Sequence, residues 1–458
     1  MNYLLIDPQI KNADYDFPNI RLTTCEAVLK ERYNIEILEF FYEKEIDKLT
    51  LDQFKKYKYD LFYKELFFKI NNVQIVYIEC EYGFLNDCIE ISKIIKKINN
   101  NIIIVVGGIF INYLYNGNIL YEVSKFTKYI DYYFVGDYIY LLNNIEIIKK
   151  NKKIYYKNFE LKQNTLKVSW EKFNLKSYKN LMVPVFFSNG CRYNKCMFCD
   201  ENLIWGNRKY IYRDVEHVLT ELKYYFEKYK ITNFYFWDSS IVSHPDFKIL
   251  CKKLSNFDIE IKWVGLSRID ELNEEKVKML KDSNCQTIEL GLEALDDHTL
   301  KNIKKGISIK DIYKTVELLK KYKINVEGSF IIGIPGDNKK IINQRITLAS
   351  NLDLNYYRWH NYQIPSISLK LKNIIFEYQE FLNLDLNIPN HLIRESINDN
   401  IGYFDMHIAD KTFFYKLTRF PKLKIGYLSV QEIIELTYSA IEKTNISRKN
   451  KALHSPFM

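Results

Sequence analysis

The sequence predicts an α/β protein with a doubly wound parallel sheet in residues 1–150 and a partial (β/α)6 barrel in residues 183–365. In the first range, short apolar runs alternate with segments of helical spacing, which is typical of parallel strands joined by helices. The alternation restarts at Val183 and gives six strand–helix units. A chain of 458 residues also has room for two or three domains of about 150 residues.

In the N-terminal domain, four apolar runs are predicted as buried strands: Tyr3–Ile6, Val73–Ile78, Ile102–Val106 and Tyr132–Val135. Between them, Arg21–Arg32 and Asn86–Ile98 have the apolar spacing of amphipathic helices. Residues 151–182 show no steady period, so we expect them to be a linker between the two domains.

The six predicted barrel strands are Val183–Phe187, Asn233–Trp237, Ile261–Leu266, Thr287–Leu292, Val326–Ile332 and Tyr356–Tyr362. Ser308 and Asp311 form an N-cap pair for a helix predicted to end near Tyr322. Ligands of parallel α/β folds bind at the carboxyl ends of the strands, so the loops there are the candidate site. Residues 366–458 are predicted as a mostly helical C-terminal region to which we assign no chemistry.

The composition narrows the class of protein. A chain with 47% hydrophobic and 27% charged residues is typical of soluble globular proteins. The net charge of +9 is mild, and no clustered basic stripe indicates a nucleic-acid partner. The N-terminus does not resemble a signal peptide, and the longest apolar run, Ile102–Ile111, is too short to span a bilayer. We therefore expect a cytoplasmic protein, in which clustered cysteines bind metal more often than they form disulfides.

The first predicted barrel strand is followed by the segment SNGCRYNKCMFCD. Its cysteines, Cys191, Cys196 and Cys199, have the spacing C-x4-C-x2-C. Three thiolates can bind three irons of a 4Fe-4S cluster and leave the fourth iron open. Gly190 would allow a close approach of the backbone to the cluster, and the aromatic Phe198 stands before the last cysteine.

Two other interpretations of this loop compete with the cluster. A structural zinc site is closed and tetrahedral, and it would need a fourth ligand, for which Asp200 is a poor candidate. A redox pair of Cys196 and Cys199 would leave Cys191 unexplained. The loop therefore favours a 4Fe-4S cluster.

The cysteine loop resembles that of the radical S-adenosylmethionine (SAM) superfamily, whose usual spacing is C-x3-C-x2-C with an aromatic residue before the last cysteine. The extra residue here resembles a variant found in members with an N-terminal cobalamin-binding-like domain. The resemblance extends over about residues 183–362. It implies a 4Fe-4S cluster, bound SAM, and hydrogen abstraction from substrate by a 5′-deoxyadenosyl radical.

Four later strand ends resemble the SAM site of that superfamily. The segment WDSS after the second strand resembles one that holds the methionine amino group, and SRID after the third supplies an arginine near the methionine carboxylate. ELGLEA at the fourth supplies a glutamate for the ribose, and the turn GIPG after the fifth faces adenine. The resemblance thus implies SAM contacts from Phe198, Asp238, Ser239, Ser240, Arg268, Glu293, Gly333, Ile334, Pro335 and Gly336.

The N-terminal domain resembles a cobalamin-binding domain. Met1–Pro8 matches its opening strand and turn, and two later turns match its glycine turns. This resemblance implies cobalamin contacts from Gly107, Gly108, Gly136 and Asp137. Residues 1–210 contain no histidine, so the domain has no histidine to serve as a lower axial ligand. A degenerate domain kept for packing or substrate access is the open alternative.

The remaining cysteines restrict the branch of the superfamily. No cysteine follows Cys285, so C-terminal auxiliary clusters cannot form. The contexts of Cys25, Cys80 and Cys88 do not match the methylthiotransferases, and we expect these three, with Cys251 and Cys285, to be buried core thiols.

The sequence therefore predicts a radical SAM enzyme that reductively cleaves SAM and, with cobalamin, transfers methyl to an unactivated carbon. One alternative is a cobalamin-free rearrangement, cyclisation or oxidation, and another is a non-catalytic iron–sulfur or zinc protein. The expected partners are a small-molecule or peptide substrate and an electron donor such as flavodoxin or ferredoxin.

Overall fold

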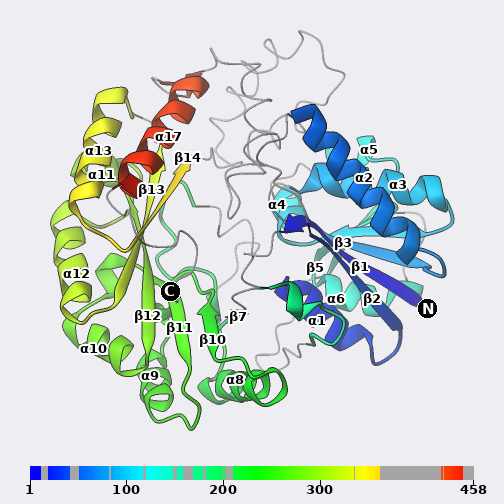
Figure 1. Cartoon of the computed structure of the whole chain (residues 1–458), viewed down its shortest axis with the longest axis horizontal. Coiled ribbons are helices and arrows are strands. Elements are labelled where there is room, and N and C mark those ends of the chain that lie inside the picture. Colours follow the sequence, from blue (N-terminus) through cyan, green and yellow to red (C-terminus); the bar gives the residue numbers. More distant parts are fainter. Residues whose placement is uncertain are drawn as a thin grey trace. The chain divides into compact units, whose positions relative to one another are not determined.

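The computed structural model describes residues 1–11, 19–41, 51–81, 84–116, 120–147, 152–157, 169–178, 182–199, 201, 210–334, 336–361, 424–425 and 428–446. The described residues up to 178 belong to one compact unit, and those from 182 onward belong to a second. Each unit contains a six-stranded sheet in which every pair of neighbouring strands is parallel (Figure 1). The predicted fold class is confirmed.

The first sheet has the strand order β2-β1-β3-β4-β5-β6. Its strands are β1 (Asn2–Lys11), β2 (Asn34–Phe41), β3 (Ile75–Glu79), β4 (Ile103–Gly107), β5 (Tyr132–Gly136) and β6 (Ile154–Lys157). Its helices are α1 (Ile20–Leu29), α2 (Leu51–Lys69), α3 (Leu85–Ile98), α4 (Ile109–Asn116), α5 (Leu120–Phe126) and α6 (Tyr138–Asn143). The strand order reverses at β1 and β3, and doubly wound sheets bind ligands at the carboxyl ends of the strands at such a point.

Two strands of this sheet differ from the sequence prediction. β2 was not predicted because Glu36 and Glu39, which are both partly exposed, interrupt its apolar run. β6 lies inside residues 151–182, where we expected a linker. It pairs with β5 in parallel, and the pairing begins with Ile154 opposite Tyr133. Its sequence, IYYK, is half-exposed at the sheet edge and lacks the apolar signal of a buried strand.

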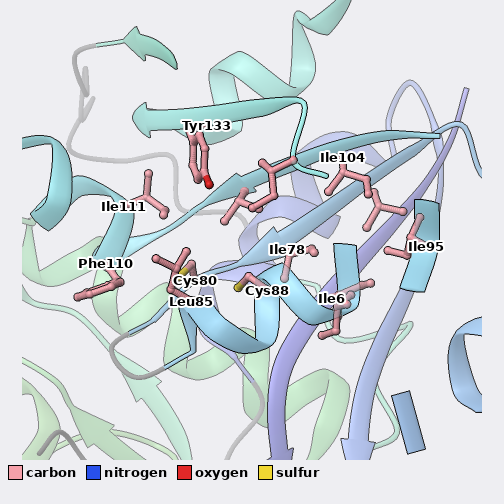
Figure 2. Packing of buried hydrophobic residues seen from close by; sticks show 14 of the residues in the cluster. Ile6, Ile78, Cys80, Leu85, Cys88, Ile95, Ile104, Phe110, Ile111 and Tyr133 are labelled. Atoms are coloured by element: carbon pink, nitrogen blue, oxygen red, sulfur yellow. The ribbon is translucent and has the colours of Figure 1, made fainter. Parts of the chain in front are cut away.

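The core of the first unit lies between this sheet and its helices. Ile6, Ile78 and Ile104 of the strands and Leu85 and Phe110 of the helices belong to one buried cluster (Figure 2). The same cluster contains two cysteines, and desolvation raises the pKa of one of them, Cys88. The expectation of buried core thiols is confirmed for all five of the residues concerned: Cys25, Cys80, Cys88, Cys251 and Cys285.

The second sheet runs in chain order, β7-β10-β11-β12-β13-β14, as a partial barrel does. Its strands are β7 (Val183–Val185), β10 (Asn233–Phe236), β11 (Lys262–Ser267), β12 (Cys285–Glu293), β13 (Asn325–Ile332) and β14 (Tyr356–Asn361). Its helices are α8 (Val215–Tyr229), α9 (Phe247–Ser255), α10 (Glu274–Asp282), α11 (Asp297–Asn302), α12 (Ile309–Lys321) and α13 (Lys339–Asn351). All six strands lie where they were predicted, and Ser308 and Asp311 form a reciprocal capping box at α12.

The two faces of the barrel sheet differ in polarity because successive side chains of a strand point to opposite faces. Ile288, Leu290 and Leu292 of β12 are fully buried on the face that packs against the helices, which line one side of the sheet in Figure 1. The alternate positions of β12, among them Glu289 and Glu293, face the inside of the barrel. The inner face is therefore the polar one.

One helix of the C-terminal region belongs to the barrel unit. α17 (Val430–Ile446) packs against β14 and α13, after a short hairpin of β15 (Lys424–Ile425) and β16 (Leu428–Ser429). The rest of the region predicted at 366–458 lies outside the described residues. Among the described helices, none combines the length and apolar character that crossing a membrane requires.

Candidate active site

The three cysteines lie in the loop that follows the carboxyl end of β7, although within the described residues no three Cys, His, Asp or Glu side chains are gathered tightly enough to hold a metal ion. Cys191 and Cys196 are half-buried, and Cys199 is the most exposed of the three. Burial raises the pKa of the half-buried Cys196 thiol, whereas the positive charges of Lys305 and Arg268 lower it. Since metal centres bind thiolates, assembly of a cluster here would have to displace protons from these thiols.

The cysteine loop is fixed to the turn between α11 and α12. The backbone N–H of Met197 donates to the Ile303 carbonyl at 3.0 Å, and the Tyr193 hydroxyl donates to the Lys304 carbonyl at 2.8 Å. Gly306 has a φ of +76°, and a Cβ at this position would collide with the Tyr193 ring. The turn at Lys305 and Gly306, which we call the Lys-Gly turn, thus forms one wall of the cysteine loop.

Arg268, at the end of β11, is brought to the same loop. Its guanidinium carbon lies 3.7 Å from the centre of the Tyr193 ring. Nη1 donates to the Cys196 sulfur at 3.8 Å, and Nη2 donates to the Lys305 carbonyl at 2.8 Å. Its backbone N–H also donates to the Ser240 hydroxyl at 3.4 Å, so three of the predicted loops meet at this residue.

Glu293 ends β12 in a left-handed backbone conformation, which residues other than glycine rarely adopt. Its φ is +62°, next to a register shift in the pairing of β12 with β13. Such a residue costs about 1–3 kcal/mol, and strain of this kind clusters at functional sites. Oε1 of Glu293 accepts a hydrogen bond from Lys305 Nζ at 2.7 Å, and both side chains are 8% exposed.

Lys305 is a site residue that the sequence analysis missed. Its ammonium lies 5.6 Å from the centre of the Phe198 ring and so links Glu293 to the cysteine loop. A Cβ on Gly291 would lie 2.6 Å from Glu293 Oε1 and 2.7 Å from Lys305 Nζ, so glycine makes room for the pair. The glycine that follows it, Gly306, marks a turn in the sequence, but no local pattern indicates a role for the lysine.

The side chains after β10 are already engaged within the protein. The fully buried Asp238 accepts from the Phe187 N–H at 3.0 Å and from the N–H and hydroxyl of Ser188. Burial raises the pKa of Asp238 to about 7, although these hydrogen bonds lower it. Ser239 donates to Glu201 at 2.6 Å, and Ser240 donates to Glu271.

Glu201 and Glu271 were not predicted. They come from other loops, and no local pattern in the sequence marks their pairing with these serines.

The predicted adenine turn after β13 is shaped by a buried ion pair that was also missed. The N–H groups of Gly333 and Ile334 both donate to Asp337 at 3.0 Å. Arg345 binds Asp337 with two hydrogen bonds of 2.9 and 2.7 Å, and both side chains are 1% exposed. Gly336 has a φ of +101° and open space on its Cβ side. Pro335 lies outside the described residues.

The four residues predicted to contact cobalamin lie at the carboxyl ends of β4 and β5. A Cβ on Gly107 would meet the Tyr77 ring at 2.9 Å, and one on Gly108 (φ +111°) would collide with Glu79. Gly136 (φ +76°) has no room for a Cβ beside the Lys157 carbonyl, and Asp137 caps α6 by accepting from the Tyr140 N–H at 3.0 Å. Internal packing thus accounts for each of these residues without a ligand.

A polar cluster that was not predicted lies at the same edge of the first sheet. Glu79 is fully buried, accepts from the Tyr77 hydroxyl at 2.6 Å, and lies 3.7 Å from Arg21. Burial raises the pKa of Glu79 to about 7, because desolvation outweighs the attraction of Arg21. Oε1 of Glu79 accepts no hydrogen bond. This edge is therefore polar at the point where doubly wound sheets bind ligands.

The partial barrel and its cysteine loop define a radical SAM domain. A family comparison agrees, because the radical SAM superfamily matches residues 185–349. Residues 185–349 are therefore similar to this superfamily, and the similarity implies a 4Fe-4S cluster and SAM.

Among curated relatives, an uncharacterized methyltransferase of Pyrococcus horikoshii is 24% identical over 362 residues, which are 74% of each chain. The bacteriochlorophyllide d C-12(1)-methyltransferase of Chlorobaculum tepidum is 28% identical over 207 residues. That match covers 43% of this chain and 44% of the relative.

Two solved structures share the fold of both units. TsrM from Kitasatospora setae, a radical SAM methyltransferase solved with cobalamin and a 4Fe-4S cluster, matches with a TM-score of 0.60 at 16% identity. The match covers 82% of this chain and 78% of TsrM. OxsB, a cobalamin-dependent SAM radical enzyme solved with aqua-cobalamin, matches with a TM-score of 0.55 at 16% identity, over 76% of this chain and 51% of OxsB.

Proposed function

We propose that this chain is a cobalamin-dependent radical SAM methyltransferase that methylates an unactivated carbon of a small molecule or peptide. The observation that carries the proposal is the convergence of Arg268, Glu293 and Lys305 on a three-cysteine loop at the carboxyl end of a partial barrel. The fold shared with TsrM over most of both chains supports the methyl-transfer assignment.

In this proposal Cys191, Cys196 and Cys199 hold the cluster, and Arg268 donates a hydrogen bond to the sulfur of Cys196. When bound, the cluster and SAM together supply the radical that abstracts hydrogen from the substrate. The chain's own part is to bind and orient these groups and to keep water away. The Tyr193 contacts with the Lys-Gly turn hold the loop for that purpose.

For SAM, Glu293 is suited to the ribose because a carboxylate can accept hydrogen bonds from both hydroxyls. Lys305 offsets the cost of burying that charge. Asp238 would contribute only backbone groups, because its carboxylate is engaged by Phe187 and Ser188. The other proposed SAM contacts are Phe198, Ser239, Ser240, Arg268, Gly333, Ile334, Pro335 and Gly336.

Cobalamin would bind at the carboxyl edge of the first sheet, against the backbone of Gly107, Gly108, Gly136 and Asp137. The polar groups of that edge, among them Oε1 of Glu79, which accepts no hydrogen bond, are compatible with a bound ligand. A cobalamin-free enzyme is the second candidate, and it is favoured by the internal packing that already explains these glycines. We also propose a cytoplasmic location and a flavodoxin or ferredoxin as donor, since SAM cleavage consumes one electron.

The test is anaerobic reconstitution of protein made with excess cobalamin. We expect one 4Fe-4S cluster per chain, slow cleavage of SAM to 5′-deoxyadenosine under reducing conditions, and corrin that stays with the protein through gel filtration. Replacement of all three cluster cysteines by Ala should abolish the cluster. A cluster that survives it would contradict the site, and corrin-free protein that still modifies a substrate would favour the second candidate.

A further inference from the structure

The inner face of the barrel carries a group of ionisable side chains below the proposed SAM site. Glu289 of β12 lies in register with Glu327 of β13, and Ser329 lies in register with Arg358 of β14. In-register residues of parallel strands point to the same face, which is the face of Gly291 and of the Glu293–Lys305 pair. We call Tyr235, Glu289, Glu327 and Arg358 the inner-face cluster.

The contacts within the inner-face cluster leave a surplus of acidic groups. Arg358 is paired with Glu327 and lies 3.8 Å from Glu289, so one guanidinium serves two carboxylates. Tyr235 donates its hydroxyl to Glu289 Oε1 at 2.9 Å. The nearby His360, which lies 3.4 Å from the Ser329 hydroxyl, is uncharged at neutral pH because burial lowers its pKa to about 3.

Both glutamates are buried and depend on the same cation. Glu289 is 7% exposed and Glu327 is 9% exposed, and the guanidinium of Arg358 lies within ion-pair distance of both. A buried carboxylate whose charge is not fully compensated is costly. The barrel does not need these charges for packing, because its helix-facing side is formed by apolar residues. A ligand that supplied a cation and hydrogen-bond donors would remove this cost.

We propose that the inner-face cluster binds a cationic amine of the substrate between Glu289 and Glu327, with the rings of Tyr235 and Trp237 as an aromatic wall. The two rings contact each other edge to face, with centroids 5.3 Å apart, and an aromatic face also attracts a cation. The inference rests on the proposed function, since it identifies the substrate of that same barrel as an amine.

The position of the inner-face cluster along the strands determines the distance between the amine of the substrate and its reacting carbon. Glu289 stands two residues before Gly291, which corresponds to about 7 Å of strand. An amine at Glu289 would thus lie roughly five bonds from a carbon at the level of the Glu293–Lys305 pair. The substrate is accordingly an amine whose reacting carbon is remote from its nitrogen.

Binding of the amine should release a proton from Glu289. Burial and the repulsion of Glu327 raise the pKa of Glu289 to about 7, whereas Arg358 and the Tyr235 hydrogen bond lower it. An ammonium group favours the ionised form of Glu289. Amine affinity should therefore increase as the pH rises through about 7.

The test is a calorimetric titration of the reconstituted full chain with phenethylamine and with the uncharged 3-phenylpropan-1-ol. We expect the amine to bind about tenfold or more tightly than the alcohol, as a charge-assisted contact predicts. The double variant Glu289→Gln, Glu327→Gln should lose this preference. The matched control Glu317→Gln, whose side chain is 74% exposed on α12, should keep it.

Equal affinities for the two probes, or a preference that survives in the double variant, would overturn the inference. The titration needs no turnover and wild-type protein alone can decide it, so a misfolded variant leaves it testable. A chain that cleaves SAM but does not prefer the amine loses this inference and keeps the proposed function. A chain that prefers the amine but cannot cleave SAM loses the proposed function instead.

Discussion

Replacing Lys305 by Met should separate the structural role of the Glu293–Lys305 pair from its role in binding. The change removes the cation 2.7 Å from Glu293 Oε1 at a site where both side chains are 8% exposed. Breaking a buried ion pair by removing one partner costs about 3–5 kcal/mol. We expect a loss of this size in the free energy of unfolding, measured by urea denaturation of the reconstituted protein.

The double variant Glu293→Gln, Lys305→Met completes the design. With no charge left unpaired, most of the lost stability should return. The double variant should nevertheless bind SAM more weakly than the wild type, because it lacks the carboxylate proposed to accept hydrogen bonds from the ribose. That charge-assisted contact is worth about 1.5–3 kcal/mol, or roughly a 10- to 150-fold increase in Kd.

The assay for binding is calorimetric titration with SAM, and Lys305→Arg is the matched control that keeps the charge. A double variant that binds SAM as tightly as the wild type would refute the placement of the ribose at Glu293. A Lys305→Met variant of undiminished stability would refute the account of the buried pair.

Three other outcomes follow from the structure. Arg268→Gln should make the reduction potential of the cluster more negative, because it removes a cation beside Cys196. A redox titration followed by electron paramagnetic resonance measures this potential, and an unchanged value would contradict the contact. Burial raises the pKa of Glu79, Asp238 and Glu289 to about 7 in each case, so the native state binds more protons than the unfolded state at mildly acidic pH. The free energy of unfolding should therefore fall as the pH rises from about 4 to 7 and less steeply in Glu79→Gln; an equal slope in that variant would contradict the assignment. Gly108→Ala should lower the free energy of unfolding by about 1–3 kcal/mol, because alanine is strained at φ +111° and its Cβ would collide with Glu79. The melting temperature should fall accordingly, and an unchanged melting temperature would contradict this packing.

The sequence predicted those parts of the fold and site that local patterns encode. The cysteine spacing, the strand-end glutamate at 293 and the capping box at Ser308 are each defined within a few residues. Lys305, Glu271 and the Asp337–Arg345 pair were missed because their roles depend on partners brought near by tertiary structure. For the same reason the glycines after β4 and β5 matched a ligand-binding pattern, although their neighbours within the fold already require glycine.

The last described helix has a consequence for where the chain can be shortened. A Cβ on Gly333 would lie 3.0 Å from Ile433 of α17, and the Trp359 indole of β14 donates to Thr444 of the same helix at 3.2 Å. A chain cut at residue 365, where the sequence places the barrel's end, would leave both of these surfaces bare. We expect such a fragment to aggregate or to lose SAM affinity even with every proposed cofactor residue present. The unit that can be isolated intact therefore extends at least to residue 446.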